Sequence, residues 1–199
     1  LLMKVPGPLT DAQERQLGHV QSSGRHLLSL INDLLDLAKI ESGHVELVRE
    51  PVDPGPVVEE VLAALRPAAQ AKGLALASEL PPDPMPLLAD RRALHQVVLN
   101  LASNGVKFTA RGGVTLRLVA DAHRPARARL EVHDTGVGIA EADLARLFGA
   151  FVQVGARRGG EGTGLGLHLS RKLAQLMGGQ LEVRSTPEVG SVFTLVLDR

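Results

Sequence analysis

The sequence predicts an α+β fold, in which a long helix precedes an α/β sandwich whose mixed sheet is covered by helices on one face. Three observations support this class. Apolar residues over 9–42 follow helical spacing, residues 114–119 and 128–133 alternate as sheet strands do, and helices and strands are mixed without strict alternation. The helical spacing ends near residue 44, where we place a boundary between two regions.

Composition narrows the class of protein. With 199 residues and 44% hydrophobic side chains, the chain can bury a core, and we expect two domains at residues 1–44 and 45–199. The 22 basic and 22 acidic residues balance, so we expect no nucleic-acid partner and no membrane contact from this chain. The lack of cysteine excludes disulfides and thiolate metal sites, and it fits a cytoplasmic location, with a membrane-anchored parent protein still possible. No apolar run reaches the roughly 20 residues that span a bilayer.

The first helix carries a wide apolar face. A lone helix with such a face is not stable in water, so the pattern predicts a coiled-coil or helix-bundle partner. Thr10 or Asp11 can cap the start of this helix, and Gly43 suits its end. We expect the partner to be a second copy of the chain or an upstream segment; packing on the chain's own second region is the alternative. The face comprises Leu17, Val20, Leu27, Leu28, Ile31, Leu34, Leu35 and Ala38.

The second region mixes strands and helices. Alternating patterns predict strands, 3.6-residue patterns predict helices, and Pro and Gly mark the breaks between them. The expected order is a strand at 45–48, a break at 51–56, a helix at 57–71, a strand at 74–80, a helix at 91–108, strands at 114–119 and 128–133, a helix from Gly166 to about Met177, and strands at 180–185 and 191–197.

A polar face on the helix expected at 91–108 is the first candidate site. Asn100, Asn104 and Lys107 are four and three residues apart and therefore share one side of the helix. Amide oxygens are suitable ligands for Mg²⁺ that already carries phosphate oxygens and water, and a lysine offers phosphate a point charge. For this helix taken alone, a solvated polar face is the alternative.

The first of two glycine runs begins at Asp134, directly after an alternating strand. A carboxylate at a strand end can accept a hydrogen bond from an exocyclic amine such as that of adenine. Gly136 and Gly138 remove side chains where a ligand must approach the backbone. An ordinary Asp–Gly turn is the alternative.

The second run, Gly162-Thr163-Gly164-Leu165-Gly166-Leu167, precedes a helix whose first N–H groups can receive phosphate. It is not a dinucleotide fingerprint or a Walker loop, because no strand is expected before it and Leu167 stands where a Walker sequence would continue with lysine. Residues 154–161 are rich in Gly and Arg, as a mobile lid would be. Arg157 and Arg158 can close on a terminal phosphate; solvated loop arginines are the alternative.

In this order the motifs resemble the catalytic ATP-binding domain of sensor histidine kinases, within the GHKL (Bergerat) superfamily that includes gyrase, MutL and heat-shock chaperone ATPases. The helix ending at residues 34–43 resembles the second helix of the dimerisation domain of these kinases. The resemblance covers residues 9–197 and is specific, because five boxes occur in order and the F box separates histidine kinases from their chaperone and gyrase relatives. The boxes are the N box at 95–109, the first glycine box at 134–139, the F box at 147–151, the second glycine box at 162–167 and a closing glycine turn at 190–193.

The resemblance implies ATP and Mg²⁺ as cofactors. It makes Asn104 the principal Mg²⁺ ligand, with Asn100 as its helper, and it makes Asn104 and Lys107 the catalytic pair. It also implies that Lys107 contacts phosphate, that Phe108 lies near the adenine ring and that Asp134 binds the adenine amine. The other implied nucleotide contacts are Gly136, Gly138, Ile139, Phe151, Arg157, Arg158, Gly162, Thr163, Gly164, Leu165, Gly166 and Leu167.

The phosphoacceptor departs from the pattern of the family. These kinases phosphorylate a histidine that an acidic residue and an Arg-Thr-Pro-like run follow, and none of the seven histidines here has that context. Because Leu1-Leu2-Met3 resembles the cut end of an earlier helix, we expect the acceptor upstream of it. A degenerate kinase is the alternative.

The expected function is therefore ATP binding and γ-phosphoryl transfer to an upstream histidine, for relay to a response-regulator receiver domain. The expected assembly is a homodimer through the first helix. Two competing functions are a non-catalytic nucleotide-binding interaction module (a pseudokinase) and a GHKL-type ATP hydrolase. A hydrolase of that branch has a carboxylate early on its N-box helix, and residues 93–96 contain none.

Overall fold

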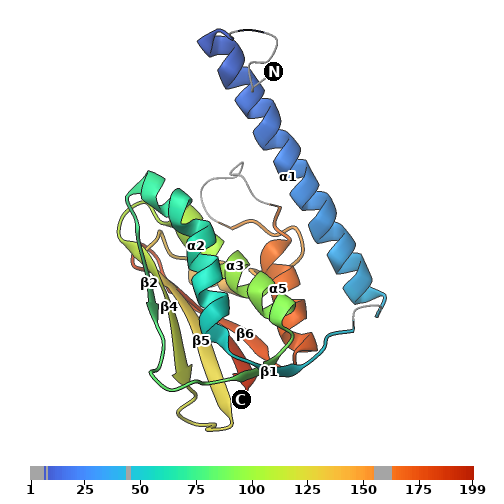
Figure 1. Cartoon of the computed structure of the whole chain (residues 1–199), viewed down its shortest axis with the longest axis vertical. Helices are drawn as coiled ribbons and strands as arrows, with labels where there is room; N and C mark the ends of the chain where they lie inside the picture. Colours follow the sequence, from blue (N-terminus) through green and yellow to red (C-terminus); the bar gives the residue numbers. More distant parts are fainter. Residues whose placement is uncertain (1–6, 8, 44–45, 155–162) are drawn as a thin grey trace.

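The computed structural model describes Gly7 and residues 9–43, 46–154 and 163–199 (Figure 1). The helices in this part of the chain are α1 (Asp11–Glu41), α2 (Pro54–Lys72), α3 (Arg91–Phe108), α4 (Glu141–Leu144) and α5 (Gly166–Leu176). The strands are β1 (Glu50–Val52), β2 (Ala75–Glu79), β3 (Leu87–Ala89), β4 (Gly113–Ala120), β5 (Arg127–Asp134), β6 (Gln180–Thr186) and β7 (Gly190–Asp198).

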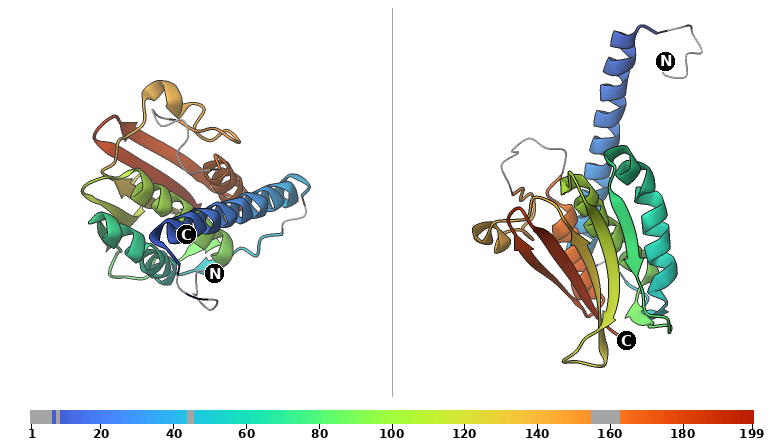
Figure 2. Two further views of the ribbon diagram at one scale, coloured as in Figure 1. Left: turned by 90° about the horizontal axis from the view of Figure 1, so that it is seen from above. Right: turned by 90° about the vertical axis from the view of Figure 1, so that its left-hand side faces the viewer.

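The main sheet is mixed and has the strand order β2-β4-β5-β7-β6. Strands β2 and β4 are parallel, and the other neighbours are antiparallel. Helices α2, α3 and α5 lie on one face of this sheet in the views of Figures 1 and 2. The predicted α+β class is confirmed.

Helix α1 projects from the rest of the chain, with its first half well beyond the sheet and its covering helices (Figures 1 and 2). Of the two candidate caps, Thr10 is the one used: its Oγ1 accepts the Gln13 N–H at 3.3 Å, and Gln13 Oε1 accepts the Thr10 N–H at 2.9 Å. Gly43 follows the end of the helix with a φ of 72°, as predicted. Six apolar side chains between Val20 and Leu35 are 46–68% exposed, so the chain's own second region does not cover this face.

The segment that leads into α2 differs from the prediction. Residues 46–49 form no strand, whereas Glu50–Val52 pairs antiparallel with Leu87–Ala89, which was not predicted. Both strands have only three residues, too few for a recognisable alternation, and Pro51 is tolerated because β1 has a single neighbour. The following proline-rich stretch was expected only to break a strand, but it also starts α2, because the first turn of a helix needs no N–H partners there.

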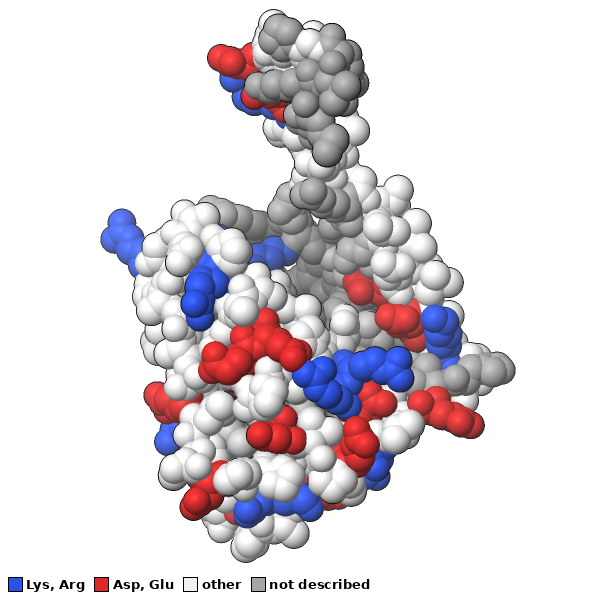
Figure 3. All heavy atoms as spheres, in the orientation of Figure 1, with Lys and Arg blue, Asp and Glu red and all other residues white. Residues whose placement is uncertain are grey.

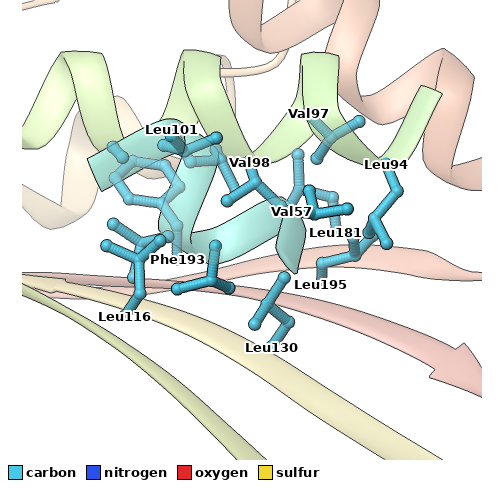
Figure 4. Close-up of a cluster of buried hydrophobic side chains, with 14 of the residues drawn as sticks. Val57, Leu94, Val97, Val98, Leu101, Leu116, Leu130, Leu181, Phe193 and Leu195 are labelled. Atoms are coloured by element: carbon cyan, nitrogen blue, oxygen red, sulfur yellow. The ribbon is translucent and has the colours of Figure 1, made fainter. Parts of the chain in front are cut away.

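The core lies between the main sheet and the helices that cover it (Figure 4). Each covering helix contributes one apolar face, and each central strand contributes alternate side chains, as the sequence periods predicted. Among the fully buried side chains are Val57 from α2, Leu94, Val97 and Leu101 from α3, Leu116 from β4, Leu130 from β5, and Leu195 from β7.

Charged side chains of both signs are interspersed on the face seen in Figure 3. Several form surface ion pairs, among them Arg127 with Asp198 and Arg91 with Glu60. Among the helices that the structure describes, none is long and apolar enough to cross a lipid bilayer.

Candidate functional site

The end of β5 and the C-terminal turns of α3 meet at one end of the main sheet. Asp134 is the last residue of β5 and pairs with Val114 of β4 and Ser191 of β7. A Cβ atom on Gly105 would lie 3.1 Å from the Val114 side chain and 3.5 Å from the Asp134 Cβ, so glycine allows α3 to pack closely there. The structure thus brings the predicted acid next to the helix turns that carry Asn104 and Lys107.

The Asp134 carboxyl group is half-buried. Burial raises its pKa, and hydrogen bonds from Gly136 and Ser191 offset this rise only in part. The Gly136 N–H donates to Asp134 Oδ1 at 2.9 Å. None of the ion pairs found between described residues includes Asp134. A half-buried carboxyl whose pKa is raised by burial is a candidate for a functional site, and it can accept a hydrogen bond from an amine.

Gly136 lies against the end of α3. A Cβ atom there would be 2.7 Å from the Phe108 carbonyl oxygen and 2.8 Å from Asp134 Oδ1. The neighbouring Val137 N–H donates to the same Phe108 oxygen at 3.4 Å. The close approach at Gly136 is therefore made by the protein itself, and the predicted approach of a ligand stays a prediction.

Gly138 is similarly required by the protein, because it packs against the turn between β6 and β7. Its φ is +66°, and a Cβ atom would lie 2.1 Å from the Thr186 carbonyl oxygen. The Ile139 N–H donates to Ser185 Oγ at 2.8 Å. These contacts fasten the first glycine run to β6.

The two asparagines of the polar face have different surroundings. Asn100 Nδ2 donates to Ser170 Oγ of α5 at 2.8 Å, and a Cβ atom on Gly166 would lie 2.4 Å from Asn100 Oδ1. Asn100 thus joins α3 to α5. The Asn104 side chain is half-buried and forms no hydrogen bond with the described residues. The metal roles of both asparagines stay predictions.

Lys107 and Phe108 are exposed at the C-terminal end of α3. The Lys107 Nζ lies 5.0 Å from the centroid of the Phe108 ring, a cation–π distance. Phe108 is 49% exposed in the described part of the chain. This is compatible with the expected place of Phe108 near adenine.

The structure describes the second glycine run from Thr163 onward. The Leu165 N–H donates to Thr163 Oγ1 at 3.1 Å, the Leu165 side chain is buried, and Gly166 begins α5. Leu167 packs against the core. The run therefore leads directly into a helix N-terminus, as predicted, whereas Arg157, Arg158 and Gly162 lie outside the described residues.

The F box contacts this run. A Cβ atom on Gly164 would lie 2.7 Å from the Phe151 carbonyl carbon, and Phe151 itself has a φ of 61°, which is uncommon for a residue other than glycine. The Phe151 ring is 64% exposed. The two predicted segments are therefore adjacent.

Helix α1 reaches the second glycine run through one hydrogen bond. Thr163 Oγ1 donates to Asp33 Oδ2 at 3.3 Å. Burial raises the pKa of Asp33, which the Thr163 hydrogen bond lowers and the neighbouring Asp36 raises further. The sequence held no signal for this contact, because Asp33 lies on a helix that was assigned to another region.

A metal ion at this site would have few protein ligands. Among the residues that the structure describes, no group of three or more His, Cys, Asp and Glu side chains could hold one. Mg²⁺ fits such a site, because it keeps several waters and binds the phosphate oxygens of its substrate. Asn104 offers an amide oxygen, which is a suitable ligand for such an ion.

Two further residues at the site were missed from the sequence. Ser170 lies four residues after Gly166, so its place on the same helix face could have been predicted. Lys72 Nζ donates to the carbonyl oxygens of Val106 and Lys107, at 2.7 Å each. A lysine at the end of a helix is usually a solvated surface charge, so only the tertiary structure shows that Lys72 contacts α3.

Comparisons with known proteins agree with this geometry. The family described as "Histidine kinase-, DNA gyrase B-, and HSP90-like ATPase" matches residues 89–199. The sensor protein TorS of Escherichia coli (strain K12) is 42% identical over 193 residues, which cover 96% of this chain and 21% of TorS. Histidine protein kinase DivJ of Caulobacter vibrioides is 42% identical over 193 residues, which cover 96% of this chain and 32% of DivJ.

The chain is also similar to solved structures. Full-length ShkA in complex with AMPPNP has a TM-score of 0.81 and 37% identity, over 98% of this chain and 40% of ShkA. The match to Acinetobacter baumannii histidine kinase AdeS has 24% identity and a TM-score of 0.75, over 99% of this chain and 89% of AdeS. At this identity the similarity shows the fold alone. The chain spans about a fifth to a third of the length of TorS and DivJ. Because the family match covers more than half of its residues, the chain belongs to the histidine kinase-, DNA gyrase B-, and HSP90-like ATPases, among relatives named as sensor histidine kinases.

Proposed function

We propose that the chain is the ATP-binding catalytic portion of a protein-histidine kinase, which transfers the γ-phosphoryl group of ATP to a histidine outside these 199 residues. The observation that carries the proposal is the half-buried Asp134 carboxyl, with its raised pKa, beside the turns of α3 that hold Asn104 and Lys107. The family of the chain and the AMPPNP in the ShkA structure support ATP as the nucleotide.

In this reaction the chain binds and orients the nucleotide. Asp134 accepts a hydrogen bond from the exocyclic amine of adenine, Phe108 lies beside the base, and the Lys107 ammonium offsets phosphate charge. The N–H groups at the start of α5 are a further anion site. We propose that the walls and lid of the site comprise the remaining predicted residues of the two glycine runs, together with Phe151, Arg157 and Arg158.

The chemical step needs no covalent group from this chain. An acceptor imidazole nitrogen bonds to the γ-phosphorus while the bond from phosphorus to the bridging oxygen breaks, and ADP leaves. Mg²⁺, held by Asn104 with Asn100 as the second proposed ligand, would neutralise phosphate charge when bound.

Two histidines near the site already have contacts of their own. His133, next to Asp134, has its Nε2 2.9 Å from Glu131 Oε2. His168 Nδ1 lies 2.9 Å from the Phe148 carbonyl oxygen. These contacts hold both rings against the protein, and neither histidine is proposed as the acceptor.

We further propose a homodimer through α1 and relay of the phosphoryl group to a response-regulator receiver domain. The exposed apolar face of α1 supports the dimer, since association would remove it from water. In this proposal residues 1–44 belong to the dimerisation region and residues 45–199 form the ATP-binding domain. Because the reaction consumes ATP, we place it in the cytoplasm.

A three-part experiment tests the function against its rivals. First, calorimetry measures whether the 199-residue chain binds Mg·AMPPNP. Second, the chain extended upstream to include the proposed acceptor is incubated with labelled ATP, and we expect acid-labile phosphohistidine. Third, phosphate release is measured. Binding without phosphohistidine would identify the non-catalytic module, and steady phosphate release without it would identify a hydrolase.

A further inference from the structure

The C-terminal end of α3 has donors for all four of its last carbonyl groups. Helix geometry leaves these four without partners inside the helix, so other groups must satisfy them. Lys72 supplies two of the four donors and lies closest to its acceptors. The pairs are Thr109 N–H to Gly105 at 3.1 Å, Lys72 Nζ to Val106 at 2.7 Å and to Lys107 at 2.7 Å, and Val137 N–H to Phe108 at 3.4 Å.

The position of Lys72 is determined by the way α2 ends. Gly73 adopts a left-handed φ of 66°, and the Leu74 N–H donates to the Ala69 carbonyl at 2.9 Å, a helix-terminating pattern. Strand β2 then runs parallel to β4, so the C-terminal ends of α2 and α3 lie at the same end of the sheet. Lys72, the last residue of α2, therefore lies beside the last turn of α3.

This last turn belongs to the candidate nucleotide site. It carries Lys107 and Phe108, and the Phe108 carbonyl binds Val137 of the first glycine run. The C-terminal end of a helix is also its negative end, which disfavours a phosphate nearby. The Lys72 ammonium lies on that end and offsets its charge.

We propose that Lys72 is a positioning residue for the nucleotide. It holds the last turn of α3 in place and neutralises the helix end, so that Lys107 and the first glycine run can meet the ligand. This rests on the proposed function, because it concerns the same nucleotide site.

The chain contains a matched control for this role. Glu60 and Arg91 form an ion pair between the same two helices, but near their N-terminal ends. Removing that pair loosens α2 against α3 away from the site. A purely structural role for Lys72 predicts that the two changes have the same effect on nucleotide binding.

The test compares the 199-residue wild-type chain with Lys72→Met, Lys72→Arg and Glu60→Gln. Mg·ADP affinity is measured by calorimetry, and urea unfolding is measured in parallel. We expect Lys72→Met to weaken Mg·ADP binding about tenfold, the size of one strong helix-end charge interaction. Lys72→Arg keeps the charge and the donors and should recover most of this loss, whereas Glu60→Gln should change affinity less than about twofold.

Three results would overturn the proposal. One is unchanged affinity in Lys72→Met, and another is an equal loss in Lys72→Met and Glu60→Gln. The third is a folded Lys72→Arg that binds no better than Lys72→Met. If the wild-type chain itself fails to bind Mg·ADP, the proposed function fails and this inference falls with it.

Discussion

The exchange of Asp134 for Asn tests the site most directly, because it alters chemistry while keeping shape. Gly136 N–H donates to Oδ1 at 2.9 Å and Ser191 also donates to this carboxyl, so an asparagine that keeps one acceptor replaces the other carboxylate oxygen with an NH₂ group. The variant loses a charge-assisted hydrogen bond of about 1.5–3 kcal/mol, and its NH₂ group would face the exocyclic amine of the ligand, which is also a donor. We therefore expect adenine nucleotides to bind at least about tenfold more weakly.

The same exchange should remove a pH-dependent loss of stability in the chain without nucleotide. Because burial raises the pKa of Asp134, the folded state binds a proton that the unfolded state releases. The contribution of this carboxyl to the unfolding free energy then falls as pH rises from its ordinary pKa through the raised one. Asparagine does not titrate, so the variant should gain stability relative to wild type as pH rises from 4 to 7.

Calorimetry with Mg·ADP and urea unfolding at both pH values measure the two effects. Asp83→Asn is the control, since it removes the same charge from an exposed loop. It should change neither quantity. Unchanged nucleotide affinity in Asp134→Asn would refute the adenine role, and a stability difference from wild type that is the same at pH 4 and pH 7 would refute the electrostatic argument.

Three further predictions concern folding and are measured by urea unfolding. Thr109 Oγ1 is buried without a partner in the described part of the chain, so Thr109→Val should raise the unfolding free energy by about 1 kcal/mol; a decrease would show that the hydroxyl is satisfied. Gly138→Ala should lower it by at least about 2 kcal/mol, because its Cβ would lie 2.1 Å from the Thr186 carbonyl oxygen at a positive φ; near-wild-type stability would contradict this packing. Asp90→Ala removes the N-cap of α3 and should cost about 1–2 kcal/mol at pH 7. Burial alone raises the pKa of Asp90, but hydrogen bonds from three backbone N–H groups lower it overall, so this cost should shrink as pH falls through the lowered pKa; a constant cost would argue against it.

The elements predicted best from the sequence are the long and strongly periodic ones. Helix α3 has the predicted bounds, and β4 and β5 extend the expected strands by one residue or so at each end. Each of these elements buries one regular face, so its local pattern already contains the tertiary arrangement.

The elements that were missed are short. Strands β1 and β3 stabilise each other through pairing between segments 35 residues or more apart, which three residues of sequence cannot indicate. Helix α4 has a single turn and no buried residue. Such elements exist because of their neighbours, so their own sequence carries little signal.

The candidate site could be predicted only where residue type determines chemistry. Asp134 and the Asn104 face were identified because few residues accept an amine or bind a metal. The link from Asn100 to Ser170 and the Lys72 contacts depend on how α2, α3 and α5 pack together. Side chains that support a site need only reach it, so many residue types and positions in the sequence could serve.

The hydrogen bond between Asp33 and Thr163 has a consequence for the movement of α1. This bond is long, at 3.3 Å, and is worth about 0.5–1.5 kcal/mol, so its loss would change the ratio of docked to undocked orientations of α1 about two- to tenfold. Asp11 lies about 33 Å from Asp33 along the helix axis, at about 1.5 Å per residue. A rotation of about 10° at Asp33 would therefore move Asp11 by about 6 Å. A small rotation at the second glycine run would thus be amplified into a large displacement at the far end of α1.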